Sequence, residues 1–230
     1  ANDALRAKVT YFDMRIEEPK ARIRILEDGT LDWMRGSSAD IPARTVVIED
    51  VHITDGAVEL IDERSGRVRH LTGLAADLSA DSLAGPWRGD GHASLDGEEA
   101  NFTISTGEVD RTEYRVPLRL RLLPGAALVA LNLDGALALS EERPEYTGKF
   151  TVDVLQEEDE TEPVEAPPPG PRLAGGFELT NDRIRVPEYR LELGPLNDPY
   201  VVTGEATLDT GENPEFLLTA DGQQIDVNRL

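Results

Sequence analysis

The segment Arg115–Leu122, with the sequence RVPLRLRL, alternates apolar side chains with arginine or proline. Successive side chains of a β-strand leave opposite faces, so this period of two indicates a half-buried strand. A helix would instead scatter the leucines around its circumference. One face of the predicted strand is apolar (Val116, Leu118, Leu120 and Leu122), and the other carries Arg115, Arg119 and Arg121.

Short segments on both sides of this stretch repeat the alternation, and none carries a sustained helical stripe at i, i+3, i+4 and i+7. Turn signals rich in Asp-Gly separate them and favour hairpins. These signals are Glu27–Gly29, Thr54–Gly56, Arg64–Gly66, Leu95–Gly97, Leu133–Gly135 and Thr210–Asn213. We therefore expect an all-β fold, an antiparallel meander of about fourteen strands that forms a long, twisted, curled sheet, or open trough, with few or no long helices.

The charge of the chain restricts its partners. There are 23 Lys+Arg against 45 Asp+Glu, which gives a formal net charge of −22. Such a surface repels nucleic acids and anionic headgroups, so we expect no nucleic-acid partner, and contact with any lipid through its apolar tails. No run approaches the ~18 apolar residues of a membrane-spanning helix. The absence of cysteine excludes disulfides, thiolate zinc sites and cysteine nucleophiles.

Residues 156–171 interrupt the strand pattern, because they are acidic and then proline-rich with almost nothing to bury. Such a composition predicts a disordered loop, and a docking peptide for a partner is the alternative. The loop separates residues 1–155 from 172–230, which we expect to be two parts of one elongated domain. The segment Ala1–Arg6 lacks the apolar region of a signal peptide, and Gln224–Leu230 carries no cap or turn signal, so the sequence reads as part of a longer protein.

No motif indicates catalysis. His52, His70 and His92 fall on three different predicted strands, without further ligands at the spacing of a known metal site. Gly89–Ser94 resembles only the start of a dinucleotide fingerprint, and no helix follows to hold a pyrophosphate. We expect a protein that is not an enzyme, with no catalytic residues, no metal and no cofactor. A β-sandwich hydrolase or sugar binder is an alternative.

The alternating segments supply candidate binding residues. A sheet with one apolar face packs against a second layer, closes on itself, or leaves a trough for a ligand. An aromatic content of only 5% favours the trough, because large rings close small cores efficiently, and aliphatic walls suit acyl chains. The candidates are Ile23, Ile25, Val46, Ile48, Val58, Leu60, Leu118, Leu120, Leu122, Phe150, Val152, Leu191, Leu193, Phe216 and Leu218. Plain core packing is the alternative for each of them.

The arginines of the opposite face have two possible roles. Arg22, Arg24 and the arginines of Arg115–Leu122 stand among many carboxylates. We expect them to pair with carboxylates across strands, and contact with lipid phosphates at the rim of a trough is the alternative.

Turn glycines and alternating aliphatics follow a recurring order over residues 45–106 and 173–230. The first part includes VVIEDVHITDGAVELID at Val46–Asp62 and HLTGLAADLS at His70–Ser79. The second contains YVVTGEATLDTG at Tyr200–Gly211, PEFLLTADG at Pro214–Gly222 and QIDVNRL at Gln224–Leu230. This order resembles the AsmA family of proteins linked to outer-membrane biogenesis in Gram-negative bacteria.

The resemblance implies a periplasmic protein anchored to the inner membrane by a segment outside these residues, and related to TamB and to bridge-like lipid-transfer proteins. It implies that phospholipid tails lie in an apolar β-trough while headgroups stay in water, and that the protein contributes to lipid transport between the inner and outer membranes. The implied partners are phospholipid and membrane proteins at either end. The alternative is a TamB-like structural or interaction module that assists outer-membrane protein assembly without bound lipid.

Overall fold

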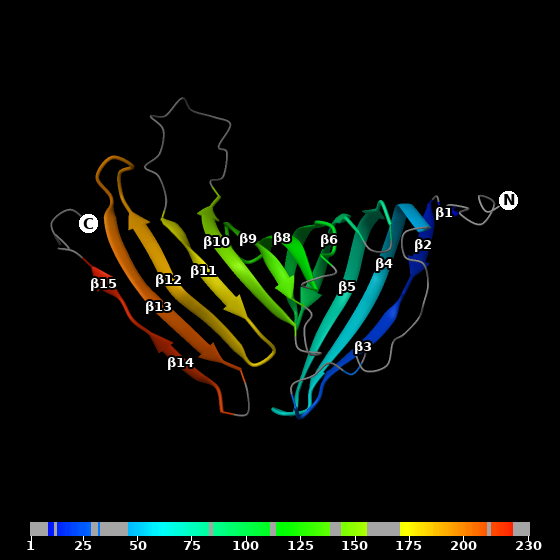
Figure 1. Ribbon diagram of the computed structural model, residues 1–230, viewed down its shortest axis with the longest axis horizontal. Coiled ribbons are helices and arrows are strands. Elements are labelled where there is room, and N and C mark those ends of the chain that lie inside the picture. The colour runs from blue at the N-terminus through cyan, green and yellow to red at the C-terminus, as the bar shows by residue number, and fades with distance from the viewer. Residues whose placement is uncertain are drawn as a thin grey trace.

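The computed structural model describes residues 9–11, 13–28, 32, 46–82, 85–110, 114–138, 144–155, 171–210 and 213–222. These residues form one sheet of fifteen strands. Figure 1 shows a single layer whose strand direction turns steadily from β3 to β13, so that the sheet curls without closing into a barrel. The expectation of an all-β, curled sheet is therefore confirmed.

Most of the sheet is an antiparallel meander in which sequence neighbours are spatial neighbours, from β4 to β14. In chain order the strands are β1 (Val9–Tyr11), β2 (Met14–Glu17), β3 (Lys20–Ile25), β4 (Val46–Asp62), β5 (Arg67–Ala80), β6 (Trp87–Leu95), β7 (Glu98–Thr106), β8 (Arg115–Pro124), β9 (Val129–Ala138), β10 (Glu145–Val154), β11 (Arg172–Leu179), β12 (Arg183–Leu193), β13 (Tyr200–Asp209), β14 (Glu215–Leu218) and β15 (Asp221–Gly222). Strands β10 and β11 pair directly across residues 156–170, which lie outside the described part of the chain.

The N-terminal edge differs from the rest of the sheet because its strands run parallel to their neighbour. Strands β1, β2 and β3 pair in turn with successive parts of the long strand β4. Asp13 and Glu18 separate them and adopt positive φ angles of 47° and 49°. This edge is thus one interrupted strand, an arrangement that the hairpin signals did not indicate.

Two of the predicted turns are wrong. Thr54–Gly56 lies inside β4, where Asp55 has a φ of 52° and the register with β5 shifts on both sides of Gly56. The Asp-Gly pair makes a bulge there instead of a hairpin, since a positive φ serves either feature. Leu133–Gly135 lies in the middle of β9. The turns at Arg64–Gly66 and Leu95–Gly97 are confirmed, with Gly66 and Gly97 at positive φ. Glu27–Gly29 and Thr210–Asn213 include residues outside the described ones.

Strand register divides the sheet into two chemically different faces. Residues paired across neighbouring strands share a face, so one row can be followed across eleven strands. That row contains Met14, Val51, Leu78, Gly89, Ile104, Leu120, Leu133, Phe150, Gly175, Tyr189 and Gly204. We call the face that carries this row the apolar face, and the opposite one the polar face.

Glycines on the apolar face mark where the sheet bends. A Cβ on Gly148 would come within 2.5 Å of the Gly135 Cα, and one on Gly91 would lie 2.9 Å from the Ala76 Cα. A Cβ on Gly175 would meet the Glu188 carbonyl oxygen and lie 2.8 Å from Phe150 Cε1. Such crowding of neighbouring backbones is expected on the concave side of a bent sheet, where only glycine fits. The glycines therefore identify the apolar face as the inside of the curl.

We expect alanine substitutions of two adjacent glycines, one on each face, to differ in their effect on stability. Gly175→Ala should lower the free energy of unfolding by about 1–3 kcal/mol, because its methyl group has no room. Gly176 lies on the polar face opposite Lys149, and a Cβ there would find its nearest neighbour, Pro187 Cγ, at 3.6 Å. Gly176→Ala should therefore leave stability unchanged or raise it by up to about 1 kcal/mol.

Urea unfolding curves of the two variants and the parent give this comparison directly. Equal stability of Gly175→Ala and Gly176→Ala would contradict the assignment of the concave side.

Candidate functional site: an uncovered apolar face

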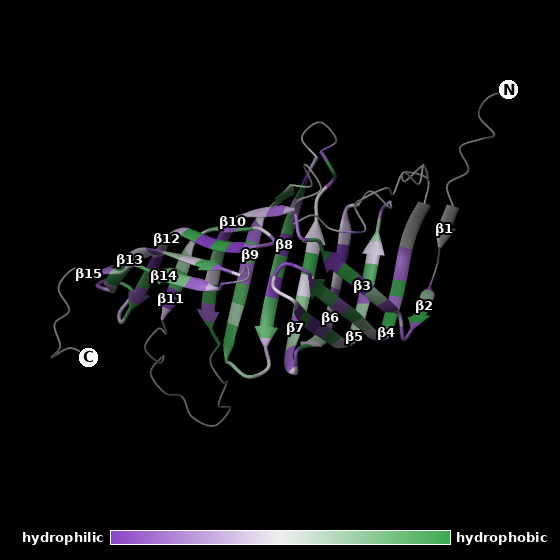
Figure 2. Ribbon diagram, turned by 90° about the horizontal axis from the view of Figure 1, so that it is seen from below, coloured by the Kyte–Doolittle hydropathy of each residue, from purple (hydrophilic) through white to green (hydrophobic). Residues whose placement is uncertain are grey.

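The apolar face brings the candidate groove residues together. Register places Ile23, Ile25, Val58, Leu60, Leu118, Leu120, Leu122, Phe150, Val152, Leu191, Leu193, Phe216 and Leu218 on it. For Val46 and Ile48 the structure gives backbone pairings only, with Val9 and with Ala80 respectively. Figure 2 shows the underlying pattern as alternating hydrophobic and hydrophilic bands along the strands. The candidates that the register places thus come from most of the length of the sheet and share one surface.

No second layer of described strands covers this face. Along β8 the apolar positions are half-buried and the polar positions exposed, and no large described side chain is fully buried. The accessible surface of the chain is 16227 Å². A compact protein of 25.2 kDa would expose roughly 10,000 Å². A single sheet with solvent on both sides contributes to this excess.

Among the described residues, the buried side chains of the apolar face gather in small groups. Val51 and Ala80 are 6% and 4% exposed, and Met14, Ile16, Ile53, Leu78 and Trp87 pack against them. Farther along the sheet, on β10 and β11, the rings of Tyr146 and Phe177 meet edge to face, with centroids 4.8 Å apart. These groups stabilise the curl locally and leave the residues between them accessible to a ligand.

Aromatic side chains on this face reach over neighbouring glycines. Phe150, Gly175, Tyr189 and Gly204 form one row over four strands. Phe150 Cε1 and Tyr189 Oη each lie 2.8 Å from where a Cβ of the adjacent glycine would be. The Tyr189 hydroxyl also donates to the Thr219 carbonyl oxygen at 2.8 Å. The end of each aromatic side chain therefore lies over the backbone of the neighbouring glycine.

Sequence patterns alone missed many residues of this surface. In short segments such as WRGDGHASL, glycines occupy positions of the apolar face, so the segment alone does not show an apolar alternation. Such residues could have been found by aligning the alternation of each strand with that of its neighbours. The missed residues include Val51, Ile53, Leu78, Trp87, Phe102, Ile104, Leu131, Leu133, Tyr146, Leu173, Phe177 and Val202.

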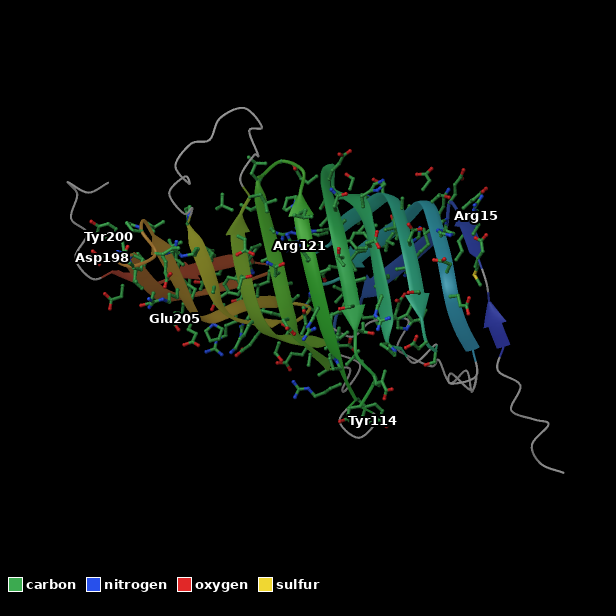
Figure 3. The ribbon with its side chains drawn as sticks, turned by 90° about the horizontal axis from the view of Figure 1, so that it is seen from above. Arg15, Tyr114, Arg121, Asp198, Tyr200 and Glu205 are labelled. Atoms are coloured by element: carbon green, nitrogen blue, oxygen red, sulfur yellow. The ribbon has the colours of Figure 1, made fainter. Side chains whose placement is uncertain are left out.

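Cross-strand pairs of charged and polar side chains lie along the polar face. Arg22 Nε lies 2.6 Å from Glu59 Oε2, Arg119 Nε lies 3.1 Å from Asp134 Oδ2, and Arg24 lies 3.7 Å from Glu63. The expected pairing of these three arginines with carboxylates is confirmed. Arg121 instead donates to the Asn132 side-chain oxygen at 3.2 Å. Figure 3, in which Arg121 and Glu205 are labelled, shows the many charged and polar side chains along the strands. Exposed pairs of this kind add little stability and keep this side in water.

The described residues do not indicate a metal site. They contain no group of three or more metal-ligating side chains. Their part of the chain also includes no helix long and apolar enough to cross a membrane. His52, His70 and His92 occupy β4, β5 and β6, as the sequence predicts, and no pair of them faces the other across neighbouring strands in the register. The apolar face is therefore the feature with the clearest binding chemistry.

The comparisons with known proteins add no relative. No family model, curated protein or solved structure matches this chain.

One titratable cluster lies on the polar face near the N-terminal edge. The His52 Nδ1 atom is hydrogen-bonded to Asp77 Oδ1, and Nε2 lies 3.6 Å from Asp13 Oδ1. The hydrogen bond to Asp77, with added attraction from Asp77, Asp50 and Asp13, raises the pKa of His52 above its ordinary 6.5. The folded chain therefore holds this proton more tightly than the unfolded chain. The resulting stabilisation is present below pH 6.5 and is lost as the pH rises through the raised value.

NMR titration of the His52 ring should show a pKa above 6.5 in the parent and a lower one in Asp77→Asn, because that substitution removes the charged acceptor. A value at or below 6.5 in the parent, or an identical value in both proteins, would rule out this assignment.

Proposed function

We propose that the apolar face is a trough that binds the acyl chains of phospholipid, and that the protein is a non-enzymatic lipid-binding and transfer domain. The observation that carries the proposal is a continuous apolar face, on the concave side of a single-layer sheet, that no second layer of described strands covers. Soluble proteins rarely leave large contiguous apolar surfaces without a ligand or partner to cover them.

The shape of the face suits chains rather than compact ligands. It consists mainly of Leu, Ile, Val and Ala side chains, with aromatic side chains and glycines among them, and contacts of acyl chains with such groups are non-directional. Burial of each CH₂ group contributes about 0.8 kcal/mol, so part of an acyl chain is enough for reversible binding. The charged polar face and the net charge of −22 disfavour attraction of anionic headgroups to the outside of the sheet.

The phospholipid class, the periplasmic location, the inner-membrane anchor and the role in transport to the outer membrane rest on the AsmA resemblance of residues 45–106 and 173–230. We propose them together with the trough, because a curled sheet with an open apolar face is the architecture that this resemblance implies. A TamB-like assembly module without bound lipid is the outcome to be distinguished by experiment.

Lipid extraction and native mass spectrometry of the purified protein should detect bound phospholipid. Leu120→Asp, which places a charge in the middle of the apolar face, should reduce lipid recovery by at least about tenfold, since burying an unpaired carboxylate against acyl chains is costly.

Ser105→Asp is the matched control for this substitution. Ser105 lies on the polar face of the adjacent strand β7, between Arg88 and Arg119 in the register, so a carboxylate is favourable there. Its lipid content should equal that of the parent. Both variants must keep the β-sheet circular dichroism spectrum. A lipid-free parent, or equal lipid loss in the two folded variants, would overturn the proposed function.

A further inference from the structure

Two hairpin turns from opposite halves of the sheet are in direct contact. Arg64, in the turn between β4 and β5, donates from Nη2 to the Asn181 carbonyl oxygen at 2.8 Å, although the two residues are 117 positions apart. Its Nη1 lies 3.8 Å from Asp182 Oδ2. Asn181 and Asp182 belong to the turn between β11 and β12. In Figure 1 the halves of the sheet approach each other where these turns lie and diverge away from them.

The contact depends on the twist of the sheet. In a flat antiparallel meander, successive turns alternate between the two ends of the strands. These two turns are an odd number of strands apart along the sheet, so they would lie at opposite ends. Neighbouring strands are rotated against each other by roughly 20–25°, which accumulates to about 140–175° over about seven strands. This rotation brings the strand ends that carry the two turns to the same side of the molecule. The Arg64 contact therefore holds together two parts of the sheet that no strand pairing joins directly.

The arginine is also unusually well fixed. Its Nε and Nη2 atoms donate to the two carboxylate oxygens of Asp62, each at 2.9 Å. The side chains of Arg64 and Asp62 are 13% and 14% exposed, whereas those of the polar-face pair Arg119 and Asp134 are 73% and 66% exposed. Burial alone would raise the pKa of Asp62, yet hydrogen bonds from Arg64 and Ser65 hold it below its ordinary value. A sheltered, forked pair resists screening far better than an exposed one.

The contact between Arg64 and the Asn181–Asp182 turn lies next to the apolar face, because Asp62 is the last residue of β4 on that face. Asp62 pairs with Ile25 in the register and follows Leu60 on that face, and Ile25 is only 8% exposed. A change in the contact would therefore change the separation of the walls that carry the apolar residues.

We propose that Asp62, Arg64 and the Asn181–Asp182 turn form a latch that fixes the separation of the two halves of the sheet, and that its release widens the trough. Admission of acyl chains to the widened trough rests on the proposed function, whereas the separation itself does not. The latch would thus control how far apart the two halves of the sheet lie.

Spin labels at Thr72→Cys and Thr203→Cys test the latch. The chain has no native cysteine, and both threonines are exposed on the polar face, one on β5 and the other on β13. Pulsed electron paramagnetic resonance should give one narrow distance distribution for the parent. In Arg64→Gln the mean distance should lengthen and the distribution should broaden. Arg119→Gln, which removes an exposed cross-strand pair, should reproduce the parent distribution.

A distribution in Arg64→Gln identical to that of the parent, or a broad distribution in the parent itself, would overturn the latch. If Arg64→Gln fails to fold by circular dichroism, Asp62→Asn takes its place, because it keeps the shape of the partner and removes only its charge, and the same widening is expected. Lipid analysis of the same samples separates the two proposals. Altered distances in a protein without phospholipid retain the latch and refute the lipid function, and unaltered distances with phospholipid bound do the reverse.

Discussion

The curl of this sheet depends on strand positions that have no room for a Cβ atom. Gly135 and Gly148 face each other across β9 and β10, and Gly175 and Gly204 lie against the ends of the Phe150 and Tyr189 side chains. Because these glycines are on the apolar face, the strands approach each other more closely on that side. The sheet therefore bends toward its apolar residues, which become the lining of a concave surface, while the charged residues remain outside. Twist accumulated along the same strands brings Arg64 to the Asn181–Asp182 turn and ties the two halves together.

This arrangement explains how a single layer persists without a conventional core. Backbone pairing joins fifteen strands, polar-face pairs such as Arg22–Glu59 link neighbours, and small apolar groups around Val51 and around Tyr146 fix the curvature locally. None of these contacts covers the apolar face. No second layer of described strands covers its apolar residues, and this observation is the one on which the proposal of lipid binding rests.

Much of the fold could be predicted from the period of two, because each strand shows its own alternation. The sequence predicts that Leu118, Leu120 and Leu122 share one face, and the register joins them to Phe150 and Leu191 on the same surface. Features that depend on distant partners could not be predicted in this way. Asp55–Gly56 has the same sequence signal as a hairpin turn but forms a bulge in β4, since the pairing of β5 decides between them. The parallel edge strands and the Arg64 contact arise from chain path and accumulated twist, which local patterns do not encode.

The most direct test of this account is whether an acyl chain reaches the apolar face and not the polar one. A bimane fluorophore is attached at Leu118→Cys or at Arg119→Cys, neighbouring residues of β8 that point to opposite faces, and a fatty acid with a nitroxide in mid-chain is added. The account predicts strong, saturable quenching at position 118 and only weak, non-saturable quenching at position 119. Equal quenching at the two positions, or no saturable quenching at 118, would contradict it.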